Sequence, residues 1–159
     1  KNLYFLISSV SLLSENKRKI TFYGEGKLKK ELLIYAKEKE VDLTIKKPIS
    51  NNKIYNVLSN YSIFTLTSFD EGSPKILLEA MAVGLVPVVT NFPTASEFVN
   101  KKTGFVTEYN EKKYSQKILD LLNNKRKLQK FSENGKKNIK DNYNQENLIS
   151  QEISILKNV

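Results

Sequence analysis

Hydrophobic and polar positions follow two different periods along the chain, one typical of helices and one typical of strands. Apolar residues that recur every three or four positions indicate amphipathic helices. They predict helices at 3–13, 25–40, 51–60, 73–84 and 94–99, and from 111 onward with breaks near 123–124 and 142–144. Short runs rich in β-branched and aromatic residues predict strands near 19–23, 42–46, 62–67, 86–90 and 104–107.

Two of the predicted helices carry specific local signals. Leu28, Leu32 and Tyr35 form the apolar stripe expected for the helix at 25–40. Thr94 and Glu97 have the Thr-x-x-Glu spacing of a capping box, which predicts that the Thr94 side chain caps the helix at 94–99.

The order of these elements predicts a Rossmann-like α/β fold with a doubly wound, mostly parallel sheet. Short strands alternate with helices along the chain, so helices should cover both faces of the sheet. Such a fold normally opens with a strand, whereas this chain opens with the helical pattern at 3–13. We therefore expect a first strand upstream of Lys1, and a slot in the sheet between the strands at 19–23 and 62–67. The expected organisation is one Rossmann-like domain at 1–143, followed by a C-terminal helix at 144–159.

The amino-acid composition limits which kinds of domain and of reactive site the sequence can form. The 159 residues are 40% hydrophobic, which suits one domain of ordinary size with a core. No apolar run approaches the roughly 20 residues of a membrane-spanning helix, and the start of the chain lacks the pattern of a signal peptide. The sequence contains no cysteine and no histidine, which excludes a thiolate metal site and a Ser-His-Asp relay within it. Acid–base chemistry must come from carboxylates, Lys, Tyr, the substrate or another domain.

The net charge of +9 admits two interpretations. One is an anionic partner, such as nucleic acid, a membrane surface or a phosphorylated ligand. The other is a set of lysines that solvate helix surfaces without a specific partner. The basic residues are dispersed, and no RNA-binding motif with interleaved aromatic residues is present, so we expect no nucleic-acid partner.

The stretch from Thr67 to Thr90 contains two glutamates, Glu71 and Glu79, on either side of a Gly-Ser-Pro-Lys turn. Ser73 is a favourable N-cap for the following helix, and Pro74 suits its first position. Gly84 can end that helix in a left-handed conformation.

Two residues of this helix need a further reason. Lys75 lies in the first turn, where the positive end of the helix dipole disfavours a cation by about 0.3–1 kcal/mol. Glu79 has apolar neighbours, so its carboxylate must face a cleft or find hydrogen-bond donors. One alternative is an ordinary Lys75–Glu79 ion pair, with Asp70 and Glu71 complementing the dipole.

A ligand with phosphates and a hydroxyl-bearing tail would account for both residues. The phosphates would lie over the helix N-terminus, against the amides after Gly72 and the Lys75 ammonium. The hydroxyl groups would reach Glu79, and Glu71 would face the other end of the diphosphate. A nucleotide-diphosphate sugar has this layout.

Several segments resemble one family. The stretch SFDEGSPKILLEAMAVGLVPVVT is similar to the donor-binding segment of the retaining GT-B glycosyltransferases of family 4, also called glycosyl transferases group 1. KITFYGEGKLKKEL, IYNVLSNYSIFTLTS and TGFVT resemble its flanking elements, in order and at normal spacing. The resemblance covers about residues 1–144 and implies the C-terminal, donor-binding half of a GT-B fold.

The resemblance also implies roles for individual residues. Glu71 would be the catalytic residue beside the donor sugar, and Glu79 would hold the ribose. Lys1 would be the lysine of the family's Arg-x4-Lys motif, and Gly26, with Gly24, would shape a neighbouring turn. The donor-binding residues implied in this way are Gly72, Ser73, Pro74, Lys75, Glu79, Lys1, Gly24, Lys47, Pro48 and Ile49, the last three bordering the base.

Finally, the resemblance implies partners. We expect a nucleotide sugar as the donor substrate, no cofactor and no metal. The acceptor, a polysaccharide, a glycolipid or a similar molecule, would be bound through an N-terminal domain that also carries the acid–base histidine. We expect a cytoplasmic bacterial enzyme, with peripheral attachment to the inner membrane surface as a further expectation. The alternatives left open are a sugar-nucleotide epimerase of GT-B shape and a non-catalytic Rossmann-like nucleotide-binding module.

Overall fold

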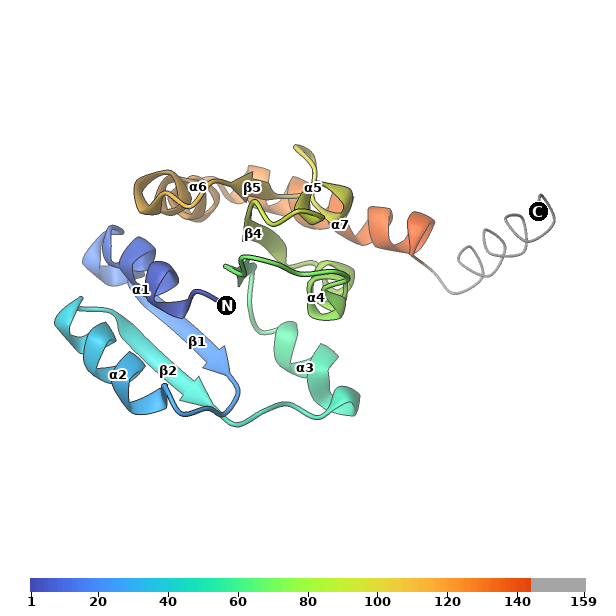
Figure 1. Ribbon diagram of the computed structural model, residues 1–159. Coiled ribbons are helices and arrows are strands. Elements are labelled where there is room, and N and C mark those ends of the chain that lie inside the picture. Colours follow the sequence, from blue (N-terminus) through green and yellow to red (C-terminus); the bar gives the residue numbers. More distant parts are fainter. Residues whose placement is uncertain (144–159) are drawn as a thin grey trace.

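The computed structural model describes residues 1–143, which fold into alternating strands and helices (Figure 1). The five strands of this part are parallel to their neighbours, and each lies within one residue of its predicted bounds. They are β1 (Lys19–Tyr23), β2 (Asp42–Lys46), β3 (Ile63–Leu66), β4 (Val86–Thr90) and β5 (Phe105–Thr107). The predicted helix at 144–159 lies outside the described residues.

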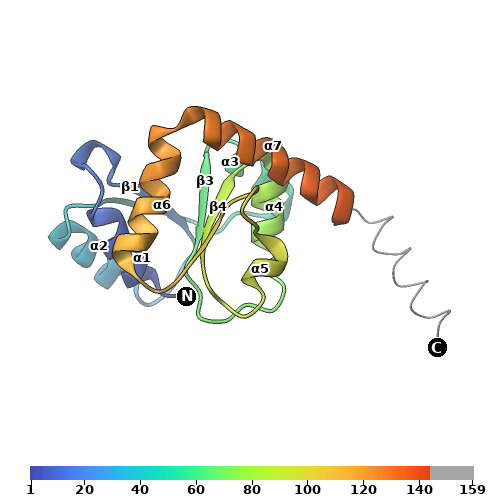
Figure 2. The same cartoon turned by 90° about the horizontal axis from the view of Figure 1, so that it is seen from above.

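Helices lie on both sides of the strands, as predicted for a Rossmann-like α/β fold. Figure 2 shows α1 and α6 on one side of β3 and β4, and α4 and α5 on the other. The helices are α1 (Leu3–Ser11), α2 (Lys29–Glu38), α3 (Ile54–Leu58), α4 (Lys75–Val83), α5 (Ala95–Phe98), α6 (Glu111–Asn123) and α7 (Lys125–Asn142), with short 3₁₀ turns η1 (Glu15–Lys17) and η2 (Asn51–Lys53). Of the helices in the described part, none is both long and apolar enough to cross a bilayer.

The strands form two separate sheets, β1–β2 and β3–β4–β5. The break falls between β1 and β3, where the sequence predicts a slot. The hydroxyl groups of Tyr23 and Tyr61 lie 2.8 Å apart across it. Burial and this hydrogen bond raise the pKa of Tyr23 to about 12.

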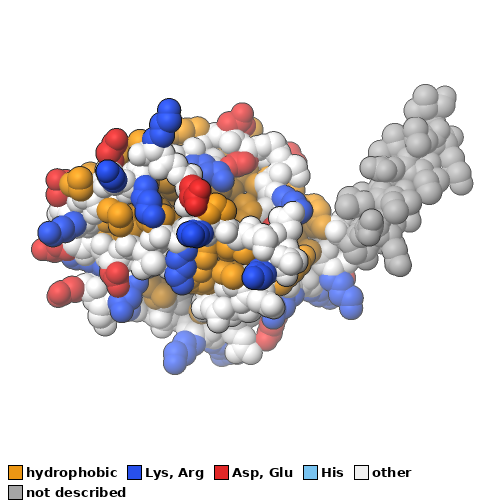
Figure 3. All heavy atoms as spheres, turned by 90° about the horizontal axis from the view of Figure 1, so that it is seen from below, with side chains coloured by type: hydrophobic (Ala, Val, Ile, Leu, Met, Phe, Trp, Pro, Cys, Tyr) orange, Lys and Arg blue, Asp and Glu red, His pale blue; other side chains and the backbone are white. Residues whose placement is uncertain are grey.

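Figure 3 shows apolar side chains gathered in the middle of the face seen from below, with charged side chains around them.

The beginning of α1 is fixed to the carboxyl end of β3. The Asn2 amide donates to the Thr67 carbonyl at 2.9 Å, and the Thr67 hydroxyl donates to the Asn2 carbonyl at 2.9 Å. The Asn2 side chain in turn accepts from the Phe5 amide and caps α1. Residues distant in sequence therefore meet at this strand end.

The largest core cluster lies between the β1–β2 sheet, β4 and helices α1, α2 and α6. Leu6, Ile7 and Val10 of α1 are all buried in it. The prediction for Leu28 is wrong. It is 46% exposed, because α2 begins at Lys29 and leaves Leu28 at the cap position, outside the packed stripe.

The N-terminus of α4 also differs from the prediction. The helix begins at Lys75, and Pro74, rather than Ser73, occupies the N-cap without a side-chain hydrogen bond. Pro74 has a ψ angle of 81°, so it cannot be the first helical residue as predicted. The prediction for Gly84 is confirmed: its φ angle is 96°, in the left-handed region that favours glycine.

The Tyr114→Phe variant tests how α6 is held on the sheet. Tyr114 is fully buried, its hydroxyl donates to the Val88 carbonyl, and its ring packs edge-on against Phe5. Loss of that hydrogen bond should lower the free energy of unfolding by about 0.5–1.5 kcal/mol in urea titrations at neutral pH.

The same variant should also change the response to alkaline pH. Burial raises the pKa of Tyr114 above the unfolded value of about 10, so folding favours the neutral phenol. The resulting stability is fully present below about pH 10 and is lost as the pH rises above it. Wild type should therefore lose more stability above pH 10 than Tyr114→Phe does. The exposed Tyr55→Phe variant is the control, and identical alkaline losses in wild type and Tyr114→Phe would refute the assignment.

Candidate functional site

The loops that follow β3, β4 and β5 meet at one edge of the sheet, because the three strands are parallel. They carry residues 67–74, 91–94 and 108–110. In Figure 2 the loops after β3 and β4 lie at the lower edge, near the N-terminus of the chain. The carboxyl edge of a parallel sheet is where ligands bind in open α/β folds, so this edge is the candidate site.

Glu71 is held at this edge by two hydroxyl groups. The buried Ser68 hydroxyl donates to Glu71 Oε1 at 2.6 Å, which orients the carboxylate. The Thr94 hydroxyl donates to the Glu71 carbonyl at 2.8 Å and lies 3.1 Å from the Gly72 carbonyl, which fixes the backbone. The predicted capping box is therefore wrong, because Thr94 makes no side-chain cap of α5 and bonds the Glu71 loop instead.

A second set of contacts fixes the start of the same loop. The Ser68 carbonyl accepts hydrogen bonds from the buried Thr90 hydroxyl, at 2.9 Å, and from the Tyr109 hydroxyl. The Tyr109 ring stacks on Phe69 at a centroid distance of 4.7 Å, although Phe69 is 64% exposed. No motif in the sequence marks Ser68, Phe69, Thr90 or Tyr109 as site residues. Their positions at the ends of strands are the only signal that could have indicated them.

The N-terminus of α4 offers free backbone donors. Gly72, Ser73 and Lys75 are exposed, whereas Pro74 is buried. The amides of Gly72, Ser73 and Ile76 have no hydrogen-bond partner within residues 1–143. Free amides at a helix N-terminus, next to the positive end of its dipole, form an arrangement that binds anions.

Glu79 lies about one turn further along α4, and its side chain is 13% exposed. Its Oε1 atom is 3.6 Å from Lys75 Nζ, so the ion pair considered as an alternative is present, at a distance too long for a hydrogen bond. Lys75 itself is 74% exposed. The Glu79 carboxylate accepts no hydrogen bond from the described part of the chain, so its oxygens are free to accept hydrogen bonds from a ligand.

The remaining predicted residues lie at the start of the chain and in the loops after β1 and β2. Lys1 is exposed and adjoins Asn2, which is bonded to Thr67. The Gly24 amide donates to the Lys46 carbonyl at 3.0 Å, so the turn after β1, which also contains Gly26, adjoins the loop after β2 that begins with Lys47 and Pro48.

Ile49 connects that loop to α4. Ile49 and Ile76 pack against the same cluster of buried residues, which includes Ile54 of α3 and Ala80 of α4. The loop expected to border the base is thereby next to the helix that carries Glu79. No hydrogen bond within residues 1–143 joins Gly24 to Glu71, so the predicted residues do not form one hydrogen-bonded cluster.

Comparison with known sequences decides the family. The profile of the family described as Glycosyl transferases group 1 matches residues 1–138. The chain belongs to this family. Its part that the structure describes contains no group of three or more His, Cys, Asp or Glu residues that could hold a metal ion.

Similar members of the glycosyl transferases group 1 family and similar structures agree with this assignment. An uncharacterized glycosyltransferase of Haemophilus influenzae is 30% identical over 135 residues, which are 84% of this chain and 38% of that protein. The catalytic domain of cholesterol-alpha-glucosyltransferase from Helicobacter pylori aligns with a TM-score of 0.80 and 25% identity, over 91% of each chain.

The C-terminal domain of a glycosyl transferase group 1 family protein, LpcC, from Francisella tularensis aligns with a TM-score of 0.78 and 22% identity. It covers 91% of this chain and 80% of that one. The chain therefore shares its fold with most of each of these two chains, which are domains of GT-B glycosyltransferases. The chain spans little more than a third of the Haemophilus relative.

The Thr94→Val variant of this glycosyltransferase domain tests how the Glu71 loop is held. Valine keeps the shape and removes the hydroxyl that bonds the Glu71 and Gly72 carbonyls. A lost hydrogen bond of about 0.5–1.5 kcal/mol should speed amide hydrogen exchange at residues 70–73 by roughly two- to tenfold. Thr65→Val in β3, where the threonine hydroxyl has no partner in the described residues, is the matched control. Unchanged exchange at 70–73 in Thr94→Val would show that the tether is unimportant.

Proposed function

We propose that this chain is the donor-binding domain of a retaining glycosyltransferase of family 4. It binds a nucleotide-diphosphate sugar and presents the sugar for transfer to an acceptor hydroxyl. The observation that carries the proposal is the arrangement around α4: an oriented Glu71 carboxylate before the helix, free amides at its N-terminus, and a Glu79 carboxylate without a hydrogen bond from the described residues one turn further.

Each part of the donor has a matching group. The diphosphate lies over the N-terminus of α4, where the amides around Gly72 and Ser73 donate to it and the exposed Lys75 ammonium neutralises its charge. The two ribose hydroxyls donate to Glu79. The base lies against the loop at 47–49, beside the turn at Gly24, where an added Cβ would meet no atom within 4 Å.

Glu71 acts at the sugar end of the donor. The Ser68 hydroxyl donates a hydrogen bond to one oxygen of the Glu71 carboxylate. This bond holds the side chain in one orientation, so its second oxygen also has a fixed direction. In the reaction the bond from the sugar to the diphosphate breaks, a bond to the acceptor oxygen forms, the acceptor hydroxyl gives up its proton to an acid–base group, and the nucleoside diphosphate leaves. Lys1 and Lys75 offset the charge that develops on this leaving group.

We further propose that the sheet is completed by a strand that precedes Lys1 in the whole protein. The two sheets are separate at this position. The Asn2 amide bonds the Thr67 carbonyl just beyond β3, where the last hydrogen bond between β3 and such a strand would lie. An N-terminal domain would then supply the acceptor site and the acid–base group. Peripheral binding to a membrane stays a prediction for that whole protein.

The Glu79→Gln variant is the first test of donor binding. Glutamine keeps the size of the side chain and removes its charge. Loss of charge-assisted hydrogen bonds of about 1.5–3 kcal/mol should weaken nucleoside diphosphate binding by roughly ten- to a hundredfold. Calorimetric titration of UDP, GDP and ADP into wild type and variant measures the change and also identifies the base.

The control and the thermal stability distinguish this role from an ordinary ion pair. Glu38→Gln at the exposed end of α2 should bind as wild type does. The unfolding temperature of Glu79→Gln should hardly change, since a pair with one largely exposed partner contributes little. Tight binding of the preferred nucleotide to Glu79→Gln, together with a lower unfolding temperature, would favour the ion-pair interpretation.

The Glu71→Gln variant should behave differently. In the two-domain enzyme it should mainly lower kcat, while nucleoside diphosphate affinity stays near the wild-type value, because Glu71 faces the sugar and not the nucleotide. An assay with and without acceptor also separates a transferase from a sugar-nucleotide epimerase. A Glu71→Gln enzyme with normal kcat would remove Glu71 from the reaction.

A further inference from the structure

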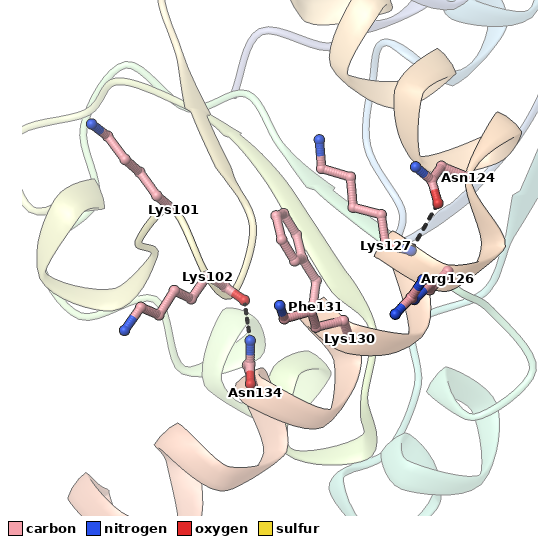
Figure 4. Close-up of a pocket in the computed structure, with 8 residues that line it drawn as sticks. All are labelled: Lys101, Lys102, Asn124, Arg126, Lys127, Lys130, Phe131 and Asn134. Atoms are coloured by element: carbon pink, nitrogen blue, oxygen red, sulfur yellow. Dashed lines mark hydrogen bonds between the residues drawn. The ribbon is translucent and has the colours of Figure 1, made fainter.

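A hollow of about 650 Å³ lies between the loop before β5 and the first three turns of α7 (Figure 4). We call it the basic hollow, because its charged lining residues are all cationic: Lys101, Lys102, Arg126, Lys127 and Lys130. The loop precedes β5, so the basic hollow lies at the amino end of that strand, whereas Glu71 follows the carboxyl end of β3. In Figure 2 the α6–α7 corner lies at the edge opposite the candidate donor site.

The walls of the basic hollow are fixed to each other. The Asn134 side chain of α7 donates to the Lys102 carbonyl at 2.8 Å, which joins the loop to the helix. Between them lies Phe131, 8% exposed, whose ring packs against Phe105 at 5.5 Å. Lys127 Nζ lies 5.2 Å from the centre of the Phe105 ring. The basic hollow therefore has an apolar floor and a cationic rim that belong to packed elements.

The charge of this rim is largely uncompensated. Lys127 pairs with Asp120 at 2.6 Å, but the other four cations have no carboxylate within ion-pair distance in residues 1–143. The first turn of α7 also contains no acidic residue and begins with Lys125, Arg126 and Lys127. Three cations at the positive end of a helix dipole repel one another and the dipole. A bound anion would remove this repulsion.

We propose that the basic hollow binds a compact phosphate-bearing anion with at least two negative charges, at a site separate from the donor site. Cations on opposite walls can each make a charge-assisted hydrogen bond to phosphate oxygens. A concave, low-dielectric wall of one charge sign also concentrates anions at the site. The phosphate can belong to a small phosphorylated molecule or to the headgroup of an anionic lipid, since both present the same chemistry.

Inorganic pyrophosphate is the probe for a small-molecule ligand, and amide chemical shifts provide a readout for each residue. Because pyrophosphate also resembles the diphosphate of the donor, shifts at 71–76 are counted separately. The proposal predicts saturable shifts at 100–103 and 124–131. These shifts should persist when a nucleoside diphosphate occupies the donor site.

The Arg126→Glu/Lys130→Glu double variant should weaken the pyrophosphate affinity measured at 124–131 by about tenfold or more. A glutamate in the first turn of α7 favours the helix dipole, so the variant should fold at least as well as wild type. Lys112→Glu/Lys137→Glu has the same net charge and lies outside the basic hollow, and it should leave these shifts unchanged. Equal weakening by both double variants would overturn the proposal, because it would show general charge attraction only.

Vesicles distinguish the lipid source. Sedimentation with phosphatidylcholine vesicles, with and without phosphatidic acid, whose phosphomonoester headgroup carries up to two negative charges, is measured for wild type and both double variants. Binding only to the anionic vesicles, lost in Arg126→Glu/Lys130→Glu and retained in the control, would assign the site to lipid headgroups. Absence of both the pyrophosphate shifts and this vesicle binding would overturn the proposal.

Discussion

The arrangement of the candidate site depends on the hydrogen bonds at the carboxyl end of β3. Thr67 is bonded to the backbone of Asn2, and the Ser68 carbonyl accepts from Thr90 of β4 and from Tyr109 after β5. The Ser68 hydroxyl then orients Glu71. Contacts from α1, β3, β4 and the loop after β5 thus meet at two consecutive residues, Thr67 and Ser68. These tertiary hydrogen bonds, rather than the sequence of the loop itself, set the conformation of the Glu71 loop.

The helix after this loop combines features that disfavour its own folding and suit a ligand. Lys75 lies in the first turn, and Glu79 accepts no hydrogen bond from residues 1–143 although it is mostly buried. The Lys75–Glu79 pair, at 3.6 Å with an exposed lysine, offsets little of this cost. The core face of α4, Leu77, Ala80 and Met81, is fully buried and keeps the helix in place. Packing on one face therefore permits unfavourable charges on the other.

Elements with a strong local pattern were predictable from sequence, and contacts between distant residues were not. The alternation of short apolar runs with helical periods predicted all five strands and the breaks on either side of α7. The preference for glycine at a helix end predicted the left-handed Gly84. The roles of Ser73 and Thr94 were mispredicted, because local capping competes with the tertiary bond from Thr94 to the Glu71 loop. Leu28 followed the helical period but lies at a helix end, where no partner covers it. Lys75 and Glu79 were noticed because they violate local helix preferences, and Glu71 because it precedes the same turn. Ser68 and Tyr109 violate no local preference, so only the three-dimensional arrangement reveals them.

A crystal structure of the chain with its preferred nucleoside diphosphate would show whether α4 holds the donor. We expect the diphosphate over the N-terminus of α4, with phosphate oxygens about 2.7–3.2 Å from the amides between Gly72 and Ile76. We also expect ribose hydroxyls within hydrogen-bond distance of Glu79 and the base against the loop at 47–49. Electron density for the nucleotide at another edge of the sheet, or a ribose that does not contact Glu79, would contradict this placement.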